Sequence, residues 1–213
     1  MGCAYEKLGN IDKALECYQK SIEVNPKYED PWHNMGLVYY NLGDYQRAIE
    51  LCQKAIELNP GAKGVEISWK LVGDAYDELG NYEKALECYQ KALEINPAHE
   101  VSWSNMGYTY NNMGNYNKAM ECYQRALGID SKDANIWSSM GYTCNNMGNY
   151  SEAIEYCRKA IDLDPSFANP WRHMGTAYKN LGNRDKAIEC YRKAIELNPN
   201  YEKAKEDLNA LLG

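Results

Sequence analysis

The chain has 213 residues, a formal net charge of −7, 45% hydrophobic residues and a mean hydropathy of −0.68. Its scattered lysines and arginines argue against nucleic acid as a partner, because a phosphate-binding surface needs clustered bases. No apolar run approaches the roughly 18–20 residues of a membrane helix, and no secretory signal opens the chain. We therefore expect a cytoplasmic protein that binds neither nucleic acid nor membrane.

Tryptophan marks a regular spacing along the chain, at Trp32, Trp69, Trp103, Trp137 and Trp171. The separations are 37, 34, 34 and 34 residues, and a fixed period of this size indicates a repeat architecture. We number the positions of one repeat as slots 1 to 34, with tryptophan at slot 4. The predicted repeats are then 29–62, 66–99, 100–133, 134–167 and 168–201.

Each repeat reads as two helices joined by a turn, as 100–133 illustrates. Slots 4, 7, 8 and 11 are spaced as one face of a helix, and Gly114 at slot 15 ends that helix. A second helical face follows at slots 17, 20, 24 and 27. Gly107 at slot 8 and Ala119 at slot 20 are small, which predicts a close antiparallel pair of helices.

The start of two first helices is marked by a proline. Asp30-Pro31 and Asn169-Pro170 have the pattern of an N-cap residue followed by proline at the first helical position. These pairs predict that the helices begin at the proline.

The ends of the array and one joint are irregular. Residues 1–28 fit the repeat only from slot 7 onward, which predicts a partial N-terminal repeat. Residues 202–213 mix leucine and alanine with charges, which predicts a C-terminal capping helix. Three extra residues precede the repeat 66–99, around Gly61–Gly64, and predict a changed stacking angle or a softer joint.

The slots occupied by tryptophan, glycine, tyrosine, alanine and proline resemble the tetratricopeptide repeat family. The resemblance covers essentially the whole chain and implies an all-α fold, a right-handed superhelical solenoid of antiparallel helix pairs in one continuous repeat domain. Cys144 departs from the pattern at slot 11, and Cys52 and Cys157 depart from it at slot 24.

The eight cysteines mostly occupy equivalent slots of different repeats. Equivalent residues of stacked helices lie about 10 Å apart or more, whereas a disulfide needs Cα atoms within about 7 Å. We expect small buried residues in a reducing compartment. No Cys-x-x-Cys pair or His/Cys cluster is present, so no metal and no cofactor are expected.

The family resemblance also implies that slots 5, 6, 9, 12 and 13 of the first helices face a concave groove. Asparagine can pair with both N–H and C=O of an extended peptide, and tyrosine adds flat contact area. Acids in 66–99 and bases in 168–201 would set the polarity of a bound peptide. The predicted groove residues are Asn34, Tyr40, Asn41, Asp74, Asp77, Asn105, Tyr108, Asn111, Asn112, Ser139, Tyr142, Asn145, Asn146, Arg172, His173 and Lys179.

These features predict a non-enzymatic scaffold whose partner is a protein or peptide, held as an extended segment or a helix. The three histidines are about two repeats apart and the paired acids lie on an open helix, so no catalytic residue is predicted. Two alternatives remain open. One is the substrate-recruiting arm of a larger enzyme such as a glycosyltransferase, which the family resemblance allows. The other is a self-assembly module that associates through its open N-terminal end.

Overall fold

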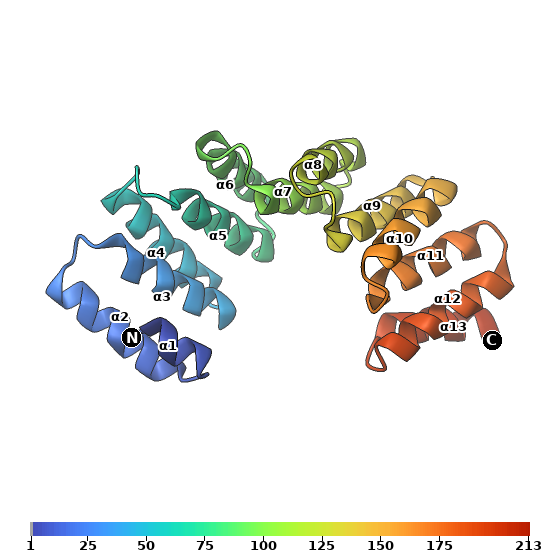
Figure 1. The fold of residues 1–213 in the computed structure, drawn as a ribbon, viewed down its shortest axis with the longest axis horizontal. Helices are drawn as coiled ribbons and strands as arrows, with labels where there is room; N and C mark the ends of the chain where they lie inside the picture. Colours follow the sequence, from blue (N-terminus) through green and yellow to red (C-terminus); the bar gives the residue numbers. More distant parts are fainter. Residues whose placement is uncertain (1) are drawn as a thin grey trace. The chain divides into compact units, whose positions relative to one another are not determined.

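A computed structural model describes residues 2–213, except for the side chain of Cys3. This described part of the chain contains thirteen α-helices and no strand (Figure 1). The helices are α1 (Gly2–Lys7), α2 (Ile11–Val24), α3 (Glu29–Asn41), α4 (Tyr45–Leu58), α5 (Val65–Glu78), α6 (Tyr82–Ile95), α7 (Glu100–Asn112), α8 (Tyr116–Ile129), α9 (Ala134–Met147), α10 (Tyr150–Leu163), α11 (Ala168–Asn180), α12 (Arg184–Leu197) and α13 (Glu202–Leu212).

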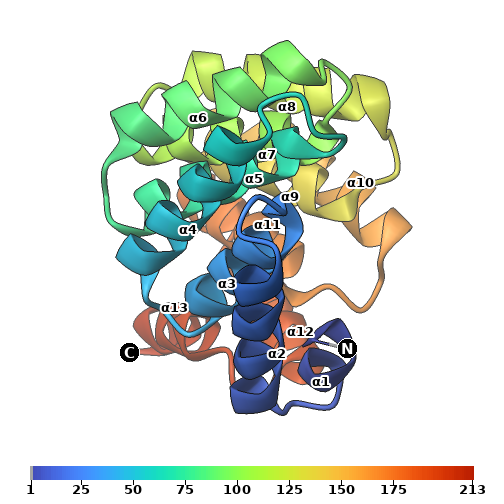
Figure 2. The same cartoon turned by 90° about the vertical axis from the view of Figure 1, so that its left-hand side faces the viewer.

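The helices group into two compact units that divide within α7, after Thr109. Within the units, consecutive helices pack against one another, for example α3 against α4, α5 against α6 and α11 against α12. Figure 2 shows α2 in front of its neighbour α3. Among the described residues, no helix is both long and apolar enough to cross a membrane.

Glycine at slot 15 ends the first helix of each repeat, as the sequence predicts. Gly148 follows α9 with φ of 80°, a left-handed conformation that residues with a side chain rarely adopt. Its N–H donates to the carbonyl groups of Cys144 and Asn145, which would otherwise be unpaired at the helix end.

Glycine at slot 8 lets the two helices of a repeat approach closely. A Cβ atom built on Gly73 would lie 2.6 Å from the ring of Tyr89, and one on Gly141 would lie 2.5 Å from Cys157 Sγ. Contacts this short do not occur between real side chains, so a larger residue at either position would force the facing side chain or helix to move. The predicted close pairing of helices is confirmed in these repeats.

The cores of the two units are apolar and rich in small residues. In the first unit, Ile49, Cys52 and Val72 are buried together, and in the second Cys144 and Cys157 are buried with their neighbours. Each of the seven cysteines whose side chains are described is a free thiol, and six of them are buried. Burial raises the pKa of the Cys52 thiol to about 12. These thiols act as packing residues.

The tryptophans are half-buried, and the indole N–H groups of Trp32, Trp103 and Trp137 bind the turn that precedes their helix, whereas that of Trp171 is buried without a hydrogen-bond partner among the described residues. The indole N–H of Trp103 donates to the Pro97 carbonyl at 3.0 Å, and that of Trp137 donates to the Ser131 carbonyl at 3.1 Å. On the other side, Lys159 Nζ lies 4.5 Å from the Trp137 ring centroid. At Trp32, Trp103 and Trp137, tryptophan at slot 4 therefore links its helix to the end of the preceding repeat.

The predicted helix starts at Asp30-Pro31 and Asn169-Pro170 are wrong by two residues. Helix α3 begins at Glu29, and Asp30 lies inside its first turn, where its carboxylate accepts a hydrogen bond from Tyr28 Oη at 2.6 Å. Proline is tolerated here because the first four N–H groups of a helix have no partner within the helix. The sequence pattern therefore predicted the correct helical turn for each helix start but placed the first residue of the helix two positions too late.

Turn hydrogen bonds close the insertion between α4 and α5. The N–H of Ala62 donates to the Asn59 carbonyl at 3.1 Å, and the N–H of Val65 donates to the Ala62 carbonyl at 3.1 Å. Gly64 precedes α5 with φ of 89°. The predicted change in stacking angle stays a prediction.

Candidate functional site

We call the surface formed by slots 5, 6, 9, 12 and 13 of the first helices the first-helix face. It is described separately for each unit. In the first unit it includes residues of α3, α5 and the part of α7 up to Thr109. In the second unit it includes the end of α7, α9 and α11.

Asp74 is the centre of a buried polar network in the first unit. The residue is 7% exposed, and one carboxylate oxygen accepts hydrogen bonds from Tyr89 Oη at 2.9 Å and Asn105 Nδ2 at 2.7 Å. The other oxygen pairs with Lys70 Nζ at 2.6 Å. A buried carboxylate needs such partners, so Asp74 and Asn105 are occupied within the protein.

Asp77 and Tyr40 are also partly buried in this unit. Asp77 accepts a hydrogen bond from the hydroxyl of Thr109, while burial raises the pKa of the Asp77 carboxyl. The Tyr40 ring lies 5.4 Å from the ring of Tyr45, and burial together with nearby acids raises the pKa of Tyr40 to about 12. Asn34 is half-buried, and Asn41 and Tyr108 are exposed.

The second unit repeats this pattern of bonds between first helices. Thr143 Oγ1 lies 3.0 Å from Asn111 Oδ1 and 2.9 Å from the backbone carbonyl oxygen of Ser139, and its single proton serves these two acceptors. Asn145 Nδ2 donates to the backbone carbonyl of His173 at 2.8 Å. Asn111 is 5% exposed, so its side chain is part of the packing.

The basic residues predicted at one end of the groove also interact with other residues of the protein. Arg172 Nε pairs with Asp207 of α13 at 2.8 Å. The His173 ring lies 5.2 Å from the Tyr142 ring, and burial, with the Arg172 charge, lowers the pKa of His173 to about 3. His173 is therefore neutral near pH 7 and offers no charge to a partner.

The first-helix face thus divides into two sets of residues. One set links consecutive first helices, or α11 to the C-terminal helix α13, through bonds that join residues 28 to 35 positions apart. We call these bonds the polar ladder. The other set is exposed and comprises Asn41, Tyr108, Asn112, Tyr142, Asn146 and Lys179.

Two residues of the polar ladder, Thr109 and Thr143, were not among the residues predicted from the sequence. Thr109 and Thr143 at slot 10 are fully buried, although they lie outside the predicted helical stripe. The signal available was that slot 10 holds small or β-branched residues in every repeat: Val38, Ala75, Thr109, Thr143 and Ala177.

Adjacent asparagines are expected to differ sharply in their effect on stability. Asn111→Ala removes one of the two acceptors near the buried Thr143 hydroxyl, which keeps the Ser139 carbonyl, and should lower the free energy of unfolding by about 0.5–1.5 kcal/mol. Asn112→Ala changes an exposed side chain and should alter it by less than about 0.5 kcal/mol. Urea unfolding followed by circular dichroism measures both. Equal effects of the two variants would contradict the ladder.

Asn146 also lines a cavity of about 610 Å³ in the second unit. The cavity lies between the end of α9 and the start of α8, and its walls include Met147 and Lys118. It combines an amide, an apolar side chain and a cation beside the exposed set. This volume is within the range of about 300–1,000 Å³ that is usual for ligand pockets.

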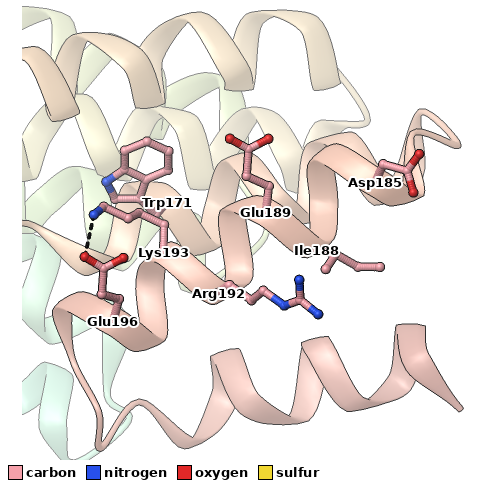
Figure 3. A pocket seen from close by; sticks show the side chains of 7 residues that line it. All are labelled: Trp171, Asp185, Ile188, Glu189, Arg192, Lys193 and Glu196. Atoms are coloured by element: carbon pink, nitrogen blue, oxygen red, sulfur yellow. Dashed lines mark hydrogen bonds and ion pairs between the residues drawn. The ribbon is translucent and has the colours of Figure 1, made fainter.

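A second cavity, of about 690 Å³, lies along α12 (Figure 3). Trp171 lies at one end beside Lys193, which pairs with Glu196 at 2.7 Å. Three acids (Asp185, Glu189 and Glu196) and two bases (Arg192 and Lys193) line this wall, so their charges largely neutralise one another. Within the described residues, no group of three or more His, Cys, Asp or Glu is placed to hold a metal ion.

Comparisons with known proteins agree with this architecture. The family model described as the Cilia and flagella-associated protein 70 C-terminal domain matches residues 1–166. The model described as the Tetratricopeptide repeat matches residues 168–201. A search of the curated proteins found no match.

Solved structures show the same fold at low sequence identity. YrrB, described as a TPR protein with an unusual peptide-binding site, is 24% identical with a TM-score of 0.67, over 90% of this chain and 97% of YrrB. The APC/C hetero-tetramer Cut9–Hcn1 gives 20% identity and a TM-score of 0.83, over 100% of this chain and 41% of that one. MamA from Desulfovibrio magneticus RS-1 is 20% identical with a TM-score of 0.70, over 82% of this chain and 97% of MamA. The predicted all-α solenoid fold class is confirmed.

Proposed function

Because the chain belongs to the tetratricopeptide repeat family, we propose that it is a non-enzymatic scaffold that binds a protein partner. The finer proposal is that an extended peptide or a helix lies along the exposed part of the first-helix face. Its free thiols fit a reducing compartment such as the cytoplasm.

The main support for this proposal is that neighbouring asparagine side chains differ in their exposure and hydrogen bonding. Asn111 and Asn145 are held in the polar ladder, whereas Asn112 and Asn146 are exposed one residue further along the same helices. An exposed amide can donate to a peptide carbonyl and accept from a peptide N–H. These positions support binding to a peptide main chain with little dependence on its sequence.

Tyr142 and the cavity next to Asn146 can contact the side chains of a bound peptide. Tyr142 is 38% exposed, and its ring is held against His173. A pre-oriented aromatic ring loses little conformational freedom when a partner binds. Met147 gives the cavity wall an apolar part that adapts to different side chains. YrrB, which has the same fold, is described as having a peptide-binding site.

The test is a double substitution that removes only exposed amides. The variant Asn112→Ala with Asn146→Ala should retain about tenfold less partner from a lysate of the source cells. The measurement is quantitative mass spectrometry of proteins retained by the immobilised chain.

Gln90→Ala with Gln124→Ala is the matched control. It removes two exposed amides from the second helices α6 and α8 and should leave retention unchanged. Both double variants should unfold at the wild-type urea concentration. Wild-type retention by the Asn112/Asn146 variant would contradict binding on the first-helix face.

A further inference from the structure

A cavity of about 150 Å³ in the first unit lies beside the three-residue insertion before α5. Its polar lining comes from the first two turns of α3, with Glu29, Asp30 and His33. Its opposite wall is apolar and includes Ala62 and Val65. No other junction between the predicted 34-residue repeats carries such an insertion.

The size of the cavity limits what it can hold. A volume of 150 Å³ equals that of about five water molecules at about 30 Å³ each. It is about half of the smallest usual pocket for a small-molecule ligand, near 300 Å³. The cavity is therefore too small for a cofactor and is suited to one side chain.

The charge of the lining favours a cation. Glu29 Oε1 accepts a hydrogen bond from Asn59 Nδ2 at 2.9 Å, and Asp30 Oδ2 accepts one from Tyr28 Oη at 2.6 Å. These bonds fix both carboxylates, and each retains a second oxygen that can accept from a ligand. Lys63 is the cation in the lining; both Lys63 and Asp30 are exposed, so solvent screens both charges, whereas Glu29 is half-buried and keeps more of its charge effect.

His33 adds a third acceptor. Its Nδ1 lies 2.8 Å from the hydroxyl oxygen of Ser68, which is 6% exposed. Burial lowers the pKa of His33, so the ring is neutral near pH 7. When Nδ1 carries the proton and donates to Ser68, Nε2 presents a lone pair to a donor in the cavity.

We propose that this cavity binds the guanidinium group of an arginine side chain from a peptide partner. A guanidinium is planar and presents five N–H donors in a rigid fork, which can bridge neighbouring carboxylates. Its aliphatic stem would contact the wall formed by Ala62 and Val65. This site is independent of the exposed set on the first-helix face.

The test uses three short peptides and the full chain labelled with ¹⁵N. Acetyl-Gly-Arg-Gly-amide should give saturable shifts of the backbone amides of residues 62–68 and of the His33 ring. The citrulline peptide, which has the same shape without the charge, should bind about tenfold more weakly or not at all. The lysine peptide should also bind more weakly, since a single ammonium cannot form the bidentate bond. Equal binding of the three peptides, or shifts spread over the whole acidic surface, would overturn the proposal.

Two variants and one control connect the binding to the cavity. Glu29→Gln with Asp30→Asn should weaken the arginine peptide about tenfold, and Ala62→Leu should do the same by filling the cavity without changing its charge. Glu83→Gln with Glu87→Gln makes the same charge change on exposed positions of α6 and should have no effect. If the Glu29/Asp30 variant does not fold, Ala62→Leu decides. Wild-type affinity in a folded cavity variant would overturn the proposal.

Discussion

Tyr89→Ala is expected to destabilise the protein by about 3–5 kcal/mol. Tyr89 is 2% exposed and its ring packs against Gly73, so alanine leaves a cavity between α5 and α6. The substitution also removes the hydroxyl that donates to Asp74 at 2.9 Å. The expected loss of stability therefore has two causes: the missing packing of the ring, and the missing hydrogen bond to the buried carboxylate of Asp74.

Tyr89→Phe separates these two contributions. It keeps the ring and removes only the hydroxyl, so we expect a loss of about 1–2 kcal/mol. Asp74 still has Lys70 and Asn105 as partners in this variant. Urea unfolding followed by circular dichroism gives both values. A loss below about 1 kcal/mol for Tyr89→Ala would mean that slot 24 does not support the core.

Gly141→Ala is expected to destabilise the second unit by about 1–3 kcal/mol. The added Cβ would lie 2.5 Å from Cys157 Sγ and 3.2 Å from the Ala153 carbonyl oxygen. The sulfur can move, but the carbonyl belongs to the backbone of α10. The two helices of the repeat must therefore separate to accept one methyl group.

Gly128→Ala is the matched control, and its effect should have the opposite sign. Gly128 lies in α8, is exposed, and has no atom within 4 Å of an added Cβ. Alanine should stabilise the helix by about 0.5–1 kcal/mol by restricting the unfolded chain. Thermal unfolding of both variants measures the difference. A neutral or stabilising Gly141→Ala would contradict the close approach of α9 and α10.

Most of the fold could be predicted because packing within a repeat is local in sequence. Glycine at slots 8 and 15 predicts a close helix pair and a helix end, and Gly141 and Gly148 have those roles in the structure. The exact start of α3 could not be predicted, since proline is compatible with any position in the first turn of a helix.

The candidate site could be predicted only in part, because contacts between repeats depend on how first helices align. Asn111 and Asn112 are both polar and lie in consecutive slots, and nothing in the sequence distinguishes them. The structure distinguishes them, because Thr143 on α9 donates a hydrogen bond to Asn111, whereas Asn112 is exposed. The residues that bind a partner remain a prediction.

The central claim is that a partner binds on the exposed part of the first-helix face. The most direct measurement is photo-crosslinking, with p-benzoylphenylalanine placed at Asn146 on α9 or at Gln124 on α8, both of which are exposed. With the partner that the wild-type chain retains supplied at a concentration that offsets the weaker binding caused by loss of the Asn146 amide, we expect a crosslinked product from position 146 and none from position 124. Crosslinking from position 124 alone, or equally from both positions, would contradict the claim.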